Sequence, residues 1–216
     1  MSLDCTTEKY ASLYSRWLEK PGDLLDLAQY VPGQKLLDLC GGTGAVTMAA
    51  LRRGAPPESI TLYDLNPRLV GPGTRGVRKV GGKAERIGFM LTEWDTYDVI
   101  VCRQAISYID YEHYPGWTFA SSIAALLKPG GKFVFNSFVH PKWTMKTYRH
   151  HNRRFLEVSG YVGRWVFHVQ ASPSLGTDVS LFRWHHEGHL YDYLSQYFHL
   201  ELLRNDKSLR WICTKR

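Results

Sequence analysis

Apolar residues follow two different patterns along the chain, and these patterns alternate. Short apolar runs, of the kind that forms buried strands, occupy 35–40, 59–67, 97–102 and 132–138. Apolar residues at helical spacing occupy 8–30, 45–54 and 116–127. Strands that alternate with helices predict a parallel sheet covered on both faces.

Two connections in this part of the chain carry turn residues. The segment 68–76, which follows the second strand, contains too many glycine and proline residues for a stable helix, so we expect a short turn or loop there. Pro129-Gly130-Gly131 predicts a turn directly before the strand at 132–138.

The C-terminal part of the chain has a different pattern. Segments 160–172 and 177–186 predict a long antiparallel pair that is rich in Trp, His and Arg. A helical pattern follows at 188–198, and the segments 199–204 and 208–214 predict a closing hairpin. Segments added at the top of an α/β sheet often form a substrate lid, which is our interpretation of the long pair.

The composition is that of a soluble protein with a single core. The chain has 216 residues, of which 44% are hydrophobic and 22% charged. No apolar run is long enough to span a bilayer, and the N-terminus lacks a basic region followed by an apolar one. Four cysteines, none in a CxxC pair, fit free thiols in a reducing compartment. We therefore expect a cytoplasmic protein with no membrane partner.

The formal net charge of +7 permits a nucleic-acid partner or an acidic substrate. The densest basic run, at 148–154, is short and carries no interleaved aromatic residues on which bases could stack. Solvated surface charge is the interpretation that we favour, and a nucleic-acid partner is the less favoured one.

A glycine-rich turn follows the first strand in the sequence KLLDLCGGTG, residues 35–44. Glycines let a chain turn sharply and let a ligand touch the main chain without a Cβ in the way. A nucleoside triphosphate loop would need Lys-Ser/Thr after the last glycine, where Ala45-Val46 stand. A dinucleotide fingerprint would need a third glycine where Thr47 stands. The third candidate ligand is S-adenosylmethionine.

The segment DLCGGTG, residues 38–44, resembles the first motif of the class I S-adenosylmethionine-dependent methyltransferases. Asp64 ends the second strand roughly 20 residues beyond the glycines, where an acid meets the ribose hydroxyls in nucleotide-binding folds of this kind. Three more segments are similar to the family's N-terminal helix and its fourth and fifth strands, namely 9–17, 97–109 and 126–138. The resemblance is to small-molecule members and weakens after residue 138.

The resemblance implies one α/β domain over 1–216, with a Rossmann-like three-layer sandwich as its fold. The sheet would be mostly parallel, with an antiparallel C-terminal hairpin strand and a β-rich lid insert. We expect covering helices at 1–30, the cofactor-binding core at 31–138, the lid at 139–187, and a helix and hairpin at 188–216.

The resemblance also implies which residues bind S-adenosylmethionine. Asp38 would orient the cofactor's ammonium group, Asp64 would accept from both ribose hydroxyls, and Tyr14 would cover the cofactor. The implied set is Tyr14, Asp38, Cys40, Gly41, Gly42, Gly44, Asp64, Leu65, Ala84, Glu85, Arg103 and Gln104. Two positions depart from the family pattern: Cys40 replaces a motif glycine, and Lys83 stands where many relatives have an acid, so that Glu85 or apolar contacts would serve the adenine.

The acceptor side of the site is less defined, and the catalytic residue stays open. Candidates are Tyr108 and Tyr111 after the fourth strand, His140 after the fifth, and Arg164, His168, Arg183 and His185 on the proposed lid. A lid that presents Arg and His suits an anionic or phenolic acceptor. The run His185-His186-Glu187-Gly188-His189 lacks the spacing of HExxH, so we expect no metal.

These features predict an enzyme that transfers a methyl group from S-adenosylmethionine to an O or N atom of a small molecule, as a monomer or homodimer. The alternative is a methyltransferase that acts on RNA or protein, for which the net charge and the run at 148–154 argue. A cofactor-binding regulator without catalysis is a third possibility.

Overall fold

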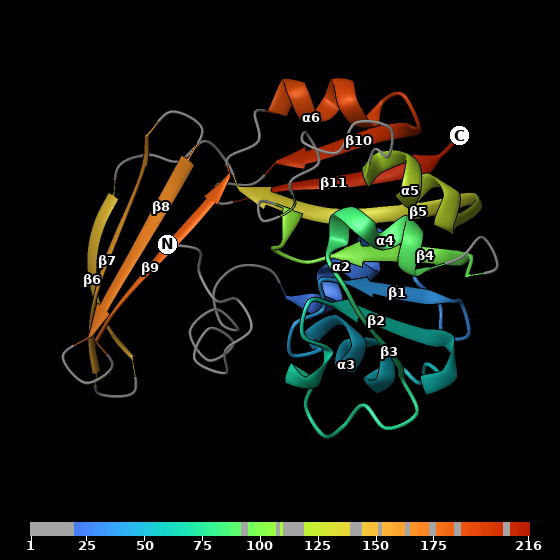
Figure 1. Ribbon diagram of the computed structural model, residues 1–216, viewed down its shortest axis with the longest axis horizontal. Coiled ribbons are helices and arrows are strands. Elements are labelled where there is room, and N and C mark those ends of the chain that lie inside the picture. The colour runs from blue at the N-terminus through green and yellow to red at the C-terminus, as the bar shows by residue number, and fades with distance from the viewer. Residues whose placement is uncertain are drawn as a thin grey trace.

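The computed structural model describes residues 20–91, 95–106, 109, 119–138, 144–150, 153–162, 165–172, 176–183, 187–204 and 208–216, with the backbone alone for the strands between 144 and 183. The central feature is a seven-stranded sheet with the order β10-β11-β5-β4-β1-β2-β3 (Figure 1). Its strands are β1 (Leu36–Leu39), β2 (Ile60–Asp64), β3 (Arg78–Gly81), β4 (Tyr97–Cys102), β5 (Leu127–Phe138), β10 (Phe198–Arg204) and β11 (Ser208–Lys215).

The pairing confirms the predicted mixture of directions. β1 is parallel to both β2 and β4, β3 is parallel to β2, and β5 is parallel to β4. β11 runs antiparallel to β5 and to β10 and closes the sheet as the predicted hairpin. β1 is buried along its whole length, as expected for a central parallel strand that is covered on both faces.

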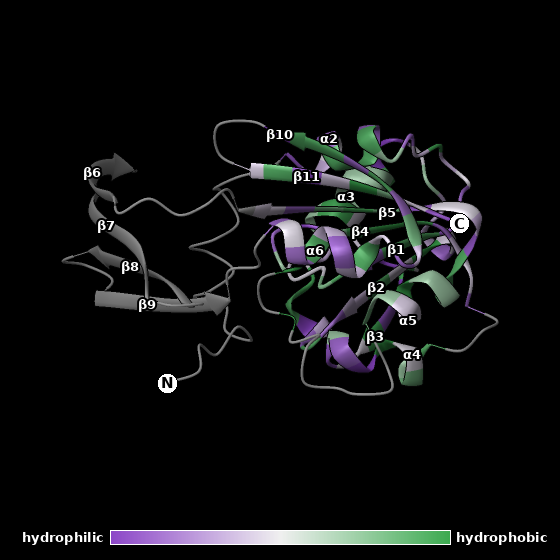
Figure 2. Ribbon diagram, turned by 90° about the horizontal axis from the view of Figure 1, so that it is seen from above, coloured by the Kyte–Doolittle hydropathy of each residue, from purple (hydrophilic) through white to green (hydrophobic). Residues whose placement is uncertain are grey.

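Helices cover both faces of the sheet, so the fold is the expected three-layer sandwich. One face packs α2 (Pro21–Leu27) and α3 (Ala45–Arg52) in a cluster that includes Leu24, Val46 and Leu36. The other face packs α4 (Ile87–Met90), α5 (Phe119–Leu126) and α6 (Glu187–Leu194). Figure 2 shows hydrophobic residues both in strands of the sheet and in the helices that pack on it. Three short 3-10 helices connect them: η1 (Pro57–Ser59), η2 (Pro67–Leu69) and η3 (Ala84–Arg86).

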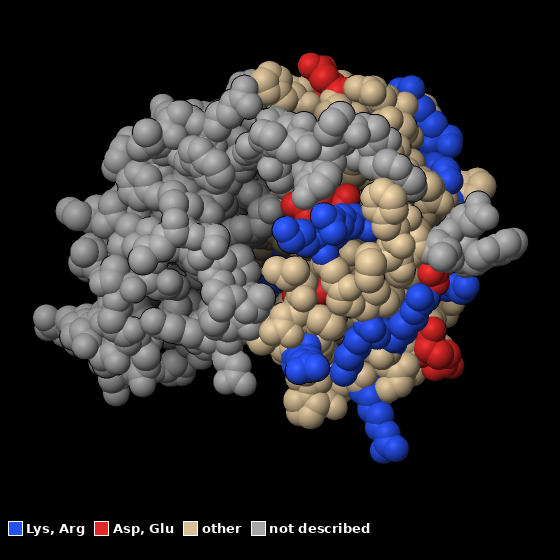
Figure 3. Space-filling view, viewed as in Figure 1, with Lys and Arg blue, Asp and Glu red and all other residues tan. Residues whose placement is uncertain are grey.

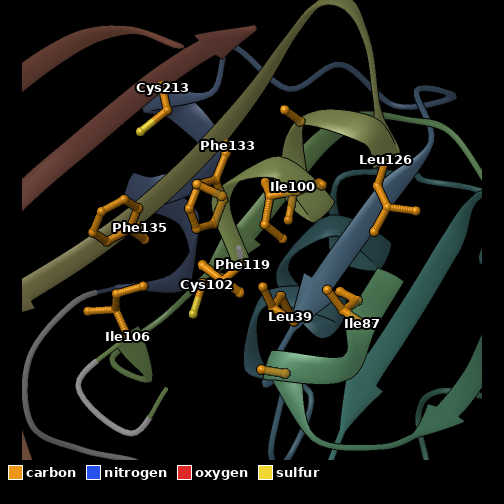
Figure 4. Close-up of a cluster of buried hydrophobic side chains, with 14 of the residues drawn as sticks. Leu39, Ile87, Ile100, Cys102, Ile106, Phe119, Leu126, Phe133, Phe135 and Cys213 are labelled. Atoms are coloured by element: carbon orange, nitrogen blue, oxygen red, sulfur yellow. The ribbon is translucent and has the colours of Figure 1, made fainter. Parts of the chain in front are cut away.

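Aromatic rings fill the larger core cluster, part of which is drawn in Figure 4. The Phe133 and Phe135 rings are stacked with centroids 4.9 Å apart, and Trp211 stacks on Phe135 at 5.7 Å. Phe119 from α5 meets Phe133 edge-on at 6.0 Å. These ring contacts pack the antiparallel hairpin against the parallel core through β5.

A second sheet, antiparallel and of four strands, lies between β5 and α6 in the sequence (Figure 1). Its strands, in the order in which they pair, are β6 (Thr144–His150), β7 (Arg153–Val162), β8 (Trp165–Ser172) and β9 (Gly176–Arg183).

The sequence predicted one antiparallel pair in this region, at 160–172 and 177–186, and the bounds of its first strand are wrong. Residues 160–162 belong to β7, and Val162 pairs with Trp165, so the chain reverses where one continuous strand was expected. The alternation of apolar residues continues across this reversal. The spacing of apolar residues therefore does not by itself mark where a strand ends. Gly163, in a connection of two residues, is the signal that could have found it.

Two details of the core also differ from the predictions. β5 begins at Leu127, earlier than predicted, and its bounds include the predicted turn at 129–131, where Gly130 has a φ of 71° and the pairing with β4 shifts between Tyr97 and Val99. The predicted loop after Asp64 is confirmed as the short helix η2, but β3 was not predicted because its sequence, RKVG, is polar and its residues are exposed or half-buried.

We expect Phe135→Ala to lower the free energy of unfolding by about 3–5 kcal/mol, because it removes a fully buried ring that contacts rings on both sides. Urea unfolding followed by circular dichroism measures this value. Phe89→Ala is the matched control, since the Phe89 side chain is 65% exposed, and we expect it to cost less than about 1 kcal/mol. Equal losses in the two variants would contradict this assignment of the core.

Candidate active site

The candidate site lies at the carboxyl edge of the parallel strands, where the strand order reverses. β1 lies between β2 and β4, and the chain continues from β1 to α3 on one face and from β4 toward α5 on the other. In open α/β sheets, ligands bind at this point. The loops that follow β1, β2 and β4 supply most of the residues predicted from the sequence.

The loop after β1 turns on three residues with positive φ: Cys40 (56°), Gly42 (53°) and Gly44 (79°). A Cβ at Gly41 would lie 2.9 Å from the side chains of Asp38 and Leu62, so this glycine is required by close packing within the protein. A Cβ at Gly42 would meet no atom of the described residues within 4 Å, so this part of the structure leaves the main chain open to a ligand on that side.

Cys40 is half-buried and adopts a conformation that favours glycine, which agrees with its place in the motif. A hydrogen bond with the Cys102 thiol, together with burial, raises the pKa of Cys40 well above its ordinary value. Both thiols are free cysteines. Cys40 is therefore a protonated thiol that packs at the end of β1, and it is no nucleophile at neutral pH.

Asp38 is buried, with 1% of its surface exposed, and its Oδ2 atom accepts two hydrogen bonds from Thr47. The Thr47 main-chain N donates at 2.9 Å and its Oγ1 hydroxyl at 2.7 Å. Burial raises the pKa of Asp38 to about 6, against the effect of these hydrogen bonds; Asp64 raises it further and Arg103 lowers it. Above this pH, Asp38 is a buried anion suited to a cationic ligand group.

Asp64 connects the end of β2 to the glycine loop. Its Oδ2 accepts from the Gly42 main-chain N at 2.9 Å, and its Oδ1 accepts from the Asn66 main-chain N at 2.8 Å. An ionised carboxylate has about four acceptor positions, so each oxygen retains capacity for a ligand hydroxyl. Leu65, the next residue, is 54% exposed.

Ala84 and Glu85 lie in η3, directly after β3. Ala84 is buried and Glu85 is half-buried. The Tyr63 hydroxyl donates to the main-chain oxygen of Lys83 at 2.8 Å and so holds this segment against β2. A Cβ at Gly82 would overlap the Tyr63 hydroxyl, so the close approach requires glycine there.

Arg103 and Gln104 follow β4, and the charge of Arg103 acts on Asp38. Gln104 has a φ of 58°, and its main-chain N donates to Asn136 Oδ1 on β5 at 2.8 Å. Side-chain and main-chain hydrogen bonds thus connect the loops after β1 and β2, and the loop after β4 is fastened to β5.

Several predicted residues lie outside the described part of the chain or have no described side chain. Those outside it are Tyr14, Tyr108, Tyr111, His140, Arg164 and His185. His168 in β8 and Arg183 in β9 are described by their backbone alone.

Three residues that hold the site were not found from the sequence: Thr47, Tyr63 and Asn136. Thr47 was considered only as a failed third glycine, although a hydroxyl in the first turn of a helix can reach back to the preceding strand. Asn136 offered a signal, because an amide within an otherwise apolar strand needs a hydrogen-bonding partner.

Charge on the described surface is mixed. On the face that Figure 3 shows, Lys and Arg form separate groups between neutral and acidic residues instead of one continuous surface. Among the residues that the structure describes, no group of three His, Cys, Asp or Glu side chains could hold a metal ion. In the same part of the chain, no helix has both the length and the apolar character needed to cross a membrane.

The chain matches the model of the methyltransferase domain family over residues 7–215, and it belongs to that family. Together with the fold, this defines a class I S-adenosylmethionine-dependent methyltransferase, an enzyme class whose cofactor is S-adenosylmethionine. The Gly42 main chain, open on one side, and the two acids at the strand ends fit that cofactor.

The curated relatives that the chain matches are longer than this chain. The chain is 25% identical over 171 residues to the ubiquinone/menaquinone biosynthesis C-methyltransferase UbiE of Bartonella tribocorum. This match covers 74% of this chain and 55% of that protein. It is 30% identical over 119 residues to the demethylmenaquinone methyltransferase of Tropheryma whipplei strain Twist, covering 51% of this chain and 44% of that one. The chain thus spans about half the length of the curated relatives it matches.

Solved structures share the fold over almost the whole chain. An amino pentose methyltransferase of Micromonospora echinaspora, involved in calicheamicin biosynthesis and solved with S-adenosylmethionine bound, superimposes with a TM-score of 0.73 at 17% identity, over 97% of this chain and 98% of that one. The sugar N-methyltransferase KedS8 of Streptoalloteichus superimposes with a TM-score of 0.66 at 15% identity, over 96% and 91%.

We expect Asp38→Asn to separate stability from binding. The native pKa of about 6 lies above the ordinary value of 3.8, so the stability associated with protonated Asp38 is present below about pH 4 and is lost as the pH rises through 6. Asn stays neutral and keeps an acceptor for Thr47. The variant should therefore unfold at a temperature equal to or above that of wild type at pH 7.5, yet bind S-adenosylhomocysteine at least tenfold more weakly.

Asp98→Asn at the opposite edge of the sheet is the control for this prediction. Burial raises the pKa of Asp98, but hydrogen bonds from Lys128 and the Lys35 main chain outweigh this effect and leave its pKa below the ordinary value. Its stabilising effect is therefore present above about pH 4 and lost in acid. Asp98→Asn should lower the unfolding temperature at pH 7.5 and leave ligand affinity unchanged. Equal affinities for wild type and Asp38→Asn would contradict the role of Asp38.

Proposed function

We propose that this protein transfers a methyl group from S-adenosylmethionine to an oxygen or nitrogen atom of a small-molecule acceptor. The observation that carries the proposal is the place of the second sheet. It leaves the core at the carboxyl end of β5, which is the edge where the loops after β1, β2 and β4 gather. A lid at this edge would enclose a small acceptor and exclude water.

The residues of the core would hold the cofactor from three sides. Asp38 would accept from the ammonium group, and Asp64 would use its remaining acceptor positions for the ribose hydroxyls. Leu65 and Ala84 would flank the adenine, and Arg103 and Gln104 would lie near the methionine tail. The bound cofactor supplies a methyl group on a sulfonium, a good leaving group, so the protein's main contribution is to orient the acceptor.

An anionic or phenolic acceptor remains our proposal for the lid side, with Arg164, His168, Tyr108 and His140 as candidates for contact or proton transfer. An acceptor that must lose a proton early needs a general base, whereas a neutral amine needs none. Support for a small acceptor comes from the proteins of similar fold named for an amino pentose and a sugar, because their structures match 97% and 96% of this chain.

Methyl transfer to carbon is a second candidate, and the curated relatives favour it, since the name of the Bartonella protein specifies a C-methyltransferase. The two candidates differ in the product. A panel of amino sugars, phenols and quinols, incubated with S-adenosylmethionine and analysed by mass spectrometry and NMR, would place the new methyl group on N, O or C.

Binding of the cofactor product is the first test. S-adenosylhomocysteine at about 100 times its dissociation constant should add roughly 2.7 kcal/mol to the free energy of unfolding, which raises the midpoint by roughly 5–11 °C for a chain of this size. Differential scanning fluorimetry measures the shift, with NAD as the control ligand and Asp98→Asn as the control variant. A shift with NAD alone would overturn the proposal.

A further inference from the structure

The turn after β4 lies where main-chain pairing between β4 and β5 ends. The last paired residues are Cys102 and Phe135, so the next step along the two strands brings Arg103 beside Asn136. One residue later, Gln104 has a φ of 58°, a region that L-residues seldom adopt without support from their surroundings. Some interaction must therefore hold this turn in place.

Asn136 supplies that interaction. Its residue is 2% exposed, and its Oδ1 accepts from the Gln104 main-chain N at 2.8 Å. The side-chain oxygen thus takes the place of the main-chain acceptor that the next step of a parallel ladder would provide. A leucine of similar size at this position would leave the N–H of Gln104 without this acceptor.

The turn determines where Arg103 stands relative to Asp38. Val101 is the register partner of Asp38 in the sheet, and Arg103 follows Val101 by two residues. Side chains two residues apart on a strand lie on the same face, so Arg103 lies on the face of Asp38. The charge of Arg103 lowers the pKa of Asp38, in agreement with this proximity. A turn that lost its anchor would move Arg103 and Gln104 together.

We propose that Asn136 is a positioning residue, which fixes the left-handed turn at Gln104 and thereby the side of the cofactor site formed by Arg103 and Gln104. This inference rests on the proposed function for its effect on binding. The contact itself can be tested without any ligand.

The experiment compares Asn136→Leu, Asn136→Asp and Ser137→Ala with wild type. Asp keeps an oxygen where Asn136 has one, whereas Leu has none. Ser137 is the matched control, because it is a buried polar neighbour on the same strand whose Oγ accepts from Trp211 Nε1 at 3.0 Å. Amide hydrogen exchange of Gln104 is followed by NMR on the free protein, and S-adenosylhomocysteine affinity is measured by calorimetry.

We expect Asn136→Leu to increase exchange at Gln104 at least tenfold relative to amides in β1 and to weaken S-adenosylhomocysteine at least tenfold. Asn136→Asp should restore both to within about threefold of wild type. Ser137→Ala should lower the unfolding temperature without changing either readout. If Asn136→Leu does not fold, Asn136→Ala replaces it with the same expectations.

Unchanged exchange at Gln104 in the Leu or Ala variant would overturn the proposed contact. Increased exchange with unchanged affinity would overturn the positioning role, as would equal effects of Asn136→Asp and Asn136→Leu. A wild-type protein that binds no S-adenosylhomocysteine would instead refute the proposed function, and the exchange experiment would still decide whether Asn136 holds the turn.

Discussion

The two hydrogen bonds that Thr47 donates to Asp38 are the interaction on which the site depends. They join the buried strand β1 to the first turn of α3 across the glycine loop, so both ends of the loop are held in place. Gly41 packs directly against the Asp38 carboxylate, and Gly42 is then presented with its main chain open. Removing either partner would release the loop and its ligand-facing side together.

This arrangement costs stability in the free protein. A carboxylate buried to 1% exposure is held charged at neutral pH, although burial raises its pKa to about 6. Arg103 and Thr47 offset part of the cost, and a ligand ammonium group would offset more. A site that stabilises a cationic group is thus destabilised without it, which is a common relation between stability and function.

Two polar side chains that were not predicted to bind the cofactor hold the remaining loops in place. Tyr63 fixes the segment before η3, and Asn136 fixes the turn after β4. Each contact crosses from one strand to the loop of another, and the partners are 20 positions apart in the first pair and 32 in the second. Precision at the carboxyl edge therefore comes from strands β2 and β5 as much as from the loops themselves.

The sequence by itself determined the parallel core, since buried parallel strands require uninterrupted apolar runs and the loops between them require glycine at defined points. It also pointed to Asp38, the glycines and Asp64, because one chain segment contains both the motif and its spacing. Strand β3 and the end of β7 at Val162 were missed, because a short polar edge strand has no apolar run and because apolar alternation continues past Val162. The roles of Thr47, Tyr63 and Asn136 were decided only by the tertiary structure. The partners of Tyr63 and Asn136 lie 20 and 32 positions away and are set by how the strands pair, which local sequence does not encode. Thr47 lies nine positions from Asp38, and the two meet because the glycine loop folds the start of α3 back onto β1.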